Sequence, residues 1–174
     1  MRLPIDVVKV EKIAFQNVVR KRASFHYNEM DKHLHQFILG IVGAGYQIKG
    51  PFFYSLNNVP LNEVVDIEMF MPISNDLFQL EGYEFSTYFE VDNLLKTVVQ
   101  GNLAEMTEVG FAKLVLSLEE NELEIATPFY HIVPKDGLQY LELLVSYFKK
   151  EGEKAFEEHY DTWMKSADVP KGSI

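Results

Sequence analysis

The sequence contains no cysteine, which excludes disulfide bonds, thiolate catalysis and cysteine-based metal sites and is typical of a reducing compartment. It also lacks a long hydrophobic run. The longest, Ile38 to Tyr46, is far shorter than the roughly 20 residues that a membrane-spanning helix needs. The first residues lack the apolar stretch of a signal peptide. We therefore expect a cytoplasmic protein that does not contact a membrane.

Basic residues are scarce. Lys and Arg number 16 against 26 Asp and Glu, and a net charge of -10 repels a phosphate backbone, so nucleic acid is not an expected partner. The only basic cluster, Arg20-Lys21-Arg22, lies in a predicted strand, where we interpret it as a solvated strand edge. No dinucleotide, P-loop or nucleophile-elbow motif is present.

The five histidines do not have metal-chelating spacing. On a helix, His33 and His35 would point roughly 200° apart, whereas a chelating pair needs a spacing of four residues. We therefore expect neither a metal nor a cofactor.

What the chain does contain is enough apolar content for one domain, at 47% of 174 residues. Its patterns give the order strand, helix, strand, strand twice, which predicts an α+β fold with an internal duplication. The repeats span about 8–74 and 83–149, within a domain of residues 1–150 that a short helical extension follows at 151–174. The first strand, residues 13–25, is one long strand or two short ones, and residues 83–100 form two extended pieces.

The second strand of the first predicted hairpin, residues 63–73, has two distinct faces. Alternation places Ile67 and Met69 on one face and Asp66, Glu68 and Phe70 on the other. By our alignment of the repeats, Glu142 corresponds to Glu68. A carboxylate beside aromatic rings is either part of a solvated sheet face or the wall of a pocket for a cation.

Four local patterns together resemble the GyrI-like effector-binding family, whose modules are tandem copies of the SHS2 fold. These are Gly50-Pro51 after the first helix, the D-x-E-x-x-x-P-I pattern that ends at Pro72-Ile73, V-Q-G-N-L at 99–103 and Y-N-E-M at 27–30. The resemblance covers residues 8–149. It implies an eight-stranded antiparallel sheet with two helices on one face. Since the sequence has no helix-turn-helix segment, the chain resembles a stand-alone member without a DNA-binding domain.

The resemblance also implies a function, the binding without catalysis of a lipophilic, cationic small molecule in a groove between two pseudo-symmetric halves. A carboxylate among aromatic rings would hold the cation, with Glu68 at the motif position. The candidate ligand-binding residues are Glu68, Glu142, Asp66, Phe52, Tyr54, Phe70, Tyr88, Tyr130 and Tyr140.

Two alternatives stay open. The same scaffold could serve as a protein-interaction or accessory protein, because the arrangement also faintly resembles proteins encoded in LXG-type toxin loci. A hydrolase that uses the groove carboxylates is a less favoured alternative, and we assign no catalytic residue. Phe156, Tyr160 and Trp163 recur at helical spacing in the extension, where they either pack on the core or form a stripe for a partner or a homodimer.

Overall fold

The computed structural model describes residues 1–59, 62–134, 139–150 and 162. Its elements, in chain order, are β1 (Val7–His26), η1 (Tyr27–Glu29), α1 (Met30–Gly43), β2 (Phe52–Leu56), β3 (Val64–Pro72), β4 (Glu84–Gln100), α2 (Leu103–Glu120), β5 (Leu123–Ile125), β6 (Phe129–Val133) and β7 (Tyr140–Lys149). The predicted extension at 151–174, with its three aromatic residues, lies outside the described residues. In the described part, no helix is long and apolar enough to cross a membrane.

The sheet has seven strands in the described residues, and the prediction of eight was wrong in its count. The segment at 83–100, which was predicted as two extended pieces, is the single strand β4. The first segment, for which one long strand or two short ones were expected, is the single strand β1. Each contains one asparagine in the left-handed region, Asn17 at φ 55° and Asn93 at φ 53°. The β1–β4 ladder continues on both sides of Asn17, because asparagine tolerates this conformation better than most residues do. The short strand β5 was not predicted.

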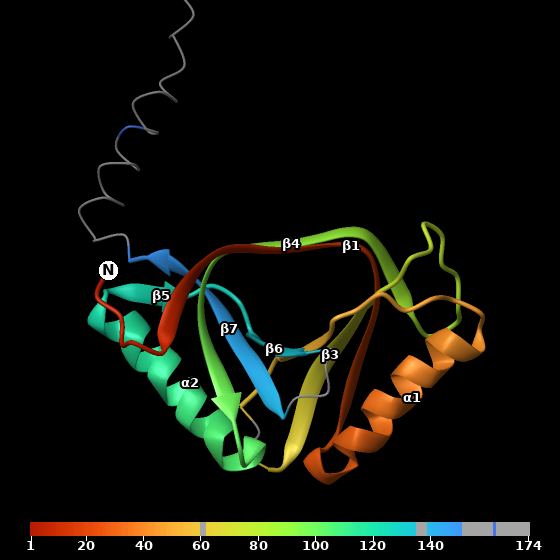
Figure 1. Cartoon of the computed structure of the whole chain (residues 1–174), viewed down its shortest axis with the longest axis horizontal. Coiled ribbons are helices and arrows are strands. Elements are labelled where there is room, and N and C mark those ends of the chain that lie inside the picture. The colour runs from red at the N-terminus through yellow and green to blue at the C-terminus, as the bar shows by residue number, and fades with distance from the viewer. Residues whose placement is uncertain (60–61, 135–138, 151–161, 163–174) are drawn as a thin grey trace, which may run out of the picture.

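The strands form a curled, antiparallel sheet in the order β4-β1-β3-β2-β6-β7-β5, and a further pairing of β4 with β7 closes the ring. Figure 1 shows β1 and β4 arching over the molecule, with α1 and α2 on opposite flanks of the arch. Both helices pack on the outer face of the sheet. Phe37 and Ile41 of α1 pack in one core cluster, and Leu114 and Leu118 of α2 pack in another.

The strand registers relate the two halves of the ring. Arg20 of β1 lies opposite Phe70 of β3, and Lys96 of β4 lies opposite Leu144 of β7 in the other half. Between these halves β2 pairs with β6. This arrangement brings the inward-facing residues of β3 and β7 to the same side of the curled sheet.

Candidate functional site on the inner face of the sheet

The inner face is the concave side of the sheet, opposite the helices. It contains a cluster of five aromatic rings. Phe53 stacks on Phe70 with centroids 4.6 Å apart and on Phe15 at 4.9 Å, and Phe89 lies 5.0 Å from Phe70. Tyr130 completes the cluster with edge-on contacts. Phe53 and Phe70 are only 0% and 2% exposed, so these rings form a packed core.

Glu68 lies on β3 two residues before Phe70, on the same face. Its carboxylate oxygen Oε1 accepts a hydrogen bond from Arg20 Nε at 2.7 Å and lies 2.6 Å from Arg20 Nη2. Arg20 also donates from Nη1 to Ser86 Oγ at 3.2 Å. Its guanidinium carbon lies 5.2 Å from the centroid of Phe70 and 5.8 Å from that of Phe89, within cation–π range. The acidic and aromatic groups predicted to hold a cation therefore hold a cation of the chain itself.

Arg20 was not predicted as a site residue, and the interpretation of its cluster as a solvated edge was wrong. β1 is not an edge strand, because it pairs with β3 on one side and with β4 on the other. Arg20 and Arg22 project inward, whereas Lys21 lies over the ring of Tyr83 at 4.7 Å. Alternation indicated these two faces, but which acid lies beside each arginine depends on the strand order.

The second predicted acid, Glu142 on β7, also has a cationic partner. Lys96 Nζ donates to Glu142 Oε1 at 3.2 Å, and their side chains are 27% and 30% exposed. In the strand registers, Lys96 and Glu142 take the places that Arg20 and Glu68 take in the first half. Each of these two acids thus already has a cationic partner.

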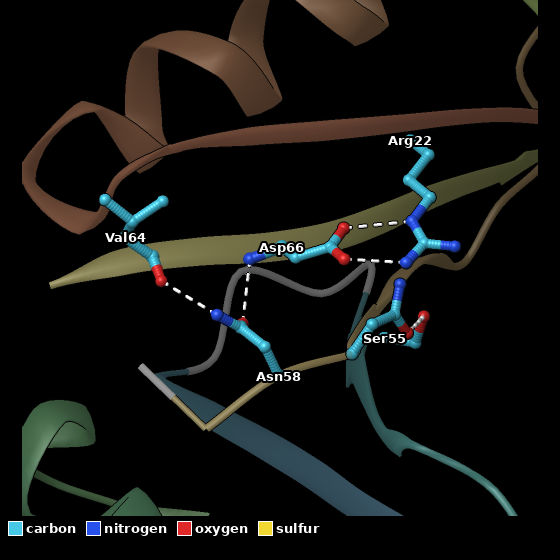
Figure 2. A network of polar contacts seen from close by, with 6 residues as sticks. Arg22, Ser55, Asn58, Val64 and Asp66 are labelled. Atoms are coloured by element: carbon cyan, nitrogen blue, oxygen red, sulfur yellow. Dashed lines mark hydrogen bonds and ion pairs between the residues drawn. The ribbon is translucent and has the colours of Figure 1, made fainter. Parts of the chain in front are cut away.

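Asp66 forms the third such pair, with Arg22. Two hydrogen bonds join them, from Nε at 2.9 Å and from Nη2 at 2.6 Å, and Figure 2 shows the two parallel contacts. The hydrogen bond from Arg22 is the main cause of the lowered pKa of the Asp66 carboxyl group. Asn58 fixes the backbone at this point, because its side chain accepts from Asp66 N and donates to the carbonyl of Val64.

The predicted aromatic residues divide between different surroundings. Phe70 and Tyr130 share the inner face with Glu68, and burial, followed by the charge of Glu68, raises the pKa of the Tyr130 phenol. Phe52 and Tyr54 lie on the outer face, packed against the core cluster of α1. The sheet itself therefore separates these two residues from Glu68.

Tyr88 and Tyr140 are not part of the aromatic cluster. Tyr88 is half exposed and donates a hydrogen bond to Glu90. Tyr140 begins β7, two residues before Glu142. Sequence reasoning missed several members of the inner face, among them Phe15, Phe53, Phe89 and Arg20, whose membership depends on strand pairing.

Three hollows in the described part of the chain lie away from Glu68. One lies at the ends of β2 and β6, and two lie near the N-terminal residues. Within the same residues, no group of three His, Asp or Glu side chains is arranged to hold a metal ion. The inner face is therefore a surface of paired charges beside packed rings.

Comparison with protein families identifies a match to the family described as "Domain of unknown function (DUF5085)" over residues 14–149. The chain belongs to this family. The matched region contains α1, α2 and all the inner-face pairs, so the site described above lies within the DUF5085 domain. Comparison with curated proteins finds no match.

Two solved structures share the fold of this DUF5085 chain. The crystal structure of the EcmrR C-terminal domain matches with a TM-score of 0.62 and 11% identity, over 82% of this chain and 96% of that domain. A cryo-EM structure of the EcmrR–DNA complex in EcmrR-RPo matches with a TM-score of 0.63 and 11% identity. That match covers 82% of this chain but only 56% of the EcmrR chain. At this identity the likeness establishes a shared fold.

Proposed function

We propose that this chain is a non-catalytic binding domain of the GyrI-like type and that it receives a lipophilic cation beside Glu68. The observation that carries the proposal is the position of Arg20. Its guanidinium rests on the Glu68 carboxylate and over two aromatic rings, so the local geometry suits a cation. A bound cation would take the place of this guanidinium.

The two-half design supports the proposal. The Arg20–Glu68 and Lys96–Glu142 pairs occupy corresponding positions in the strand registers, as expected of an internal duplication. The shared fold with the EcmrR C-terminal domain is consistent with a binding domain. Each acid is held by a cation of the chain, an arrangement that does not favour the hydrolase alternative.

The packing restricts where a ligand can lie. The rings of Phe53 and Phe70 are fully buried against each other, whereas the side chain of Glu68 is 18% exposed and that of Glu142 is 30% exposed. A ligand would therefore bind along the Glu68 rim, which is the partly exposed surface formed by Glu68 and Glu142 beside the aromatic cluster. Because Arg20 is 30% exposed, its guanidinium can turn into solvent without disturbing the core.

Calorimetric titration with tetraphenylphosphonium, a lipophilic cation, tests the proposal. We expect saturable binding that Glu68→Gln weakens about tenfold, because the acid contributes the charge attraction. Glu90→Gln is the matched control, since Glu90 also pairs with a cation but lies outside the inner face, and it should leave the affinity unchanged. Tetraphenylborate has the same shape and opposite charge and should not bind. Equal affinity of the wild type and Glu68→Gln would contradict the proposal.

A protein-interaction domain on the same scaffold is the second candidate. The observation that favours it is the pairing of Glu68, Asp66 and Glu142 with cations of the chain, next to rings that leave little free space. If tetraphenylphosphonium does not bind wild-type protein, this second candidate replaces the first. Its binding would then depend on surfaces other than the Glu68 rim.

A further inference from the structure

A hollow of about 310 Å³ lies where the two halves of the chain meet, at the ends of β2 and β6. Its lining is apolar except at one position, and it consists of Ile48, Lys49, Gly50, Phe52, Met71, Val133 and Pro134. The volume is at the lower end of the range for small-molecule sites, and such sites are commonly found where two structural units meet. The hollow shares no lining residue with the inner-face acids.

The wall contributed by residues 47–50 is fixed in place by backbone contacts. Lys49 N and Gly50 N both donate to the carbonyl of Pro72, at 2.8 and 3.1 Å. Ile48 forms a β-bridge with Ile73, and Gln47 N donates to Asn75 Oδ1 at 3.0 Å. Since these bonds hold the wall in place, a ligand would meet a preformed surface and lose little binding energy to ordering it.

The floor and the opposite wall are also held in place. Phe52 packs against Phe37 of α1 and is paired with Val133 across the β2–β6 ladder. Met71, from β3, is 3% exposed, whereas Ile48 and Val133 are 42% and 37% exposed. Apolar surface is therefore open to solvent at the rim of a rigid hollow, which favours an apolar ligand.

Lys49 is the single charged residue of the lining. It is exposed, and it forms no ion pair with the described residues. The net charge of the chain is -10, but no acid among the described residues pairs with this lysine. Most of the arginines and lysines that project from the sheet are paired with acids, as Arg20, Arg22 and Lys96 are. An apolar hollow beside a free ammonium group matches the chemistry of a small molecule with an apolar body and a carboxylate.

We propose that this hollow, defined by Lys49, Phe52, Met71 and Val133, is a second ligand site, which takes a small aliphatic carboxylate. The apolar body would lie on Phe52 and Met71, and the carboxylate would face Lys49. This site differs from the proposed cation site in position, in charge and in the face of the sheet that it uses.

Titration with octanoate, followed by calorimetry, tests this site. We expect saturable binding to the wild type that Lys49→Gln weakens about fivefold, because one charge contact is lost. Val133→Trp should abolish binding by filling the hollow, and Ile48→Trp provides a second filling variant at an exposed position if the first does not fold. Lys32→Gln is the matched control, since Lys32 is an exposed lysine of α1 outside the hollow, and it should bind as the wild type does.

Two further titrations separate this proposal from the cation site. Octanoate binding should be unchanged by Glu68→Gln, and tetraphenylphosphonium binding should be unchanged by Val133→Trp. The proposal is overturned if octanoate shows no saturable binding to the wild type. It is also overturned if Lys49→Gln binds like the wild type, or if octylammonium binds as tightly as octanoate.

Discussion

At the scale of single residues, the central feature is the pairing of Glu68, Asp66 and Glu142 with cations of the chain. A partly exposed ion pair contributes little to stability, with a typical value of about 0–1 kcal/mol. Its effect on the binding of an external cation is larger. With Arg20 in place, the Arg20–Glu68 pair has no net charge, so an external cation must compete with the guanidinium for the carboxylate. The affinity of the site therefore depends on how readily Arg20 leaves.

His131 gives a pH dependence at this scale. It is 3% exposed, and its ring stacks on Tyr54 with centroids 4.4 Å apart while Phe111 lies edge-on at 5.5 Å. Burial lowers the pKa of its imidazole from 6.5 to about 4, so the folded protein holds it neutral. The unfolded chain binds a proton below pH 6.5. Stability from this group is complete above pH 6.5 and is lost as the pH falls toward 4.

We expect the free energy of unfolding to fall by roughly 3 kcal/mol between pH 6.5 and 4 because of His131. Urea denaturation across this range measures the fall. His131→Phe should flatten the curve in this window, since a phenyl ring keeps the packing and does not titrate. A variant that keeps the full slope would assign the pH dependence to other groups.

At the scale of elements, the close packing of α2 against the sheet depends on one glycine. A Cβ atom at Gly110 would lie 2.6 Å from Leu143 Cδ1 and 3.0 Å from Val99 Cγ2, and both of these side chains are buried. Alanine at this position would require Leu143 and Val99 to repack or the helix to move away from β4 and β7. The sequence could not show this close approach, because it depends on how α2 packs on β4 and β7.

Gly110→Ala should therefore destabilise the protein by about 1–3 kcal/mol through overpacking. Gly43, in the last turn of α1, is the matched control, because nothing lies within 4 Å of a Cβ atom built there. Gly43→Ala should be neutral or stabilising by up to about 1 kcal/mol, since alanine is the better helix former. Thermal denaturation of both variants measures the difference in stability. Equal stability changes would exclude close packing of α2 at Gly110.

At the scale of the whole molecule, the local patterns predicted much of the fold. The two helices, the hairpin strands and the inward direction of Glu68 and Phe70 follow from side-chain periodicity and turn chemistry. The number of strands was not predicted correctly, because a single left-handed asparagine can keep a long strand continuous where the sequence suggests a break. The separation of Phe52 and Tyr54 from Glu68 follows from alternation only once the pairing of β2 with β3 is known.

The identity of the cation beside Glu68 was also beyond local sequence. Arg20 and Glu68 are 48 positions apart in the chain, and they meet only because β1 lies beside β3. A carboxylate that looks free in the sequence therefore has an internal partner in the fold. The same holds for Lys96 and Glu142 in the other half.

The exchange of Arg20 for an external cation is tested most directly by nuclear magnetic resonance of the arginine side chains. Tetraphenylphosphonium is added to wild-type protein while the Nε–Hε signals of Arg20 and Arg22 are followed. We predict that the Arg20 signal moves, saturably, toward the position of a solvent-exposed arginine, while that of Arg22 stays in place on Asp66. An Arg20 signal that does not move while the cation binds, or a cation that does not bind, would contradict the account.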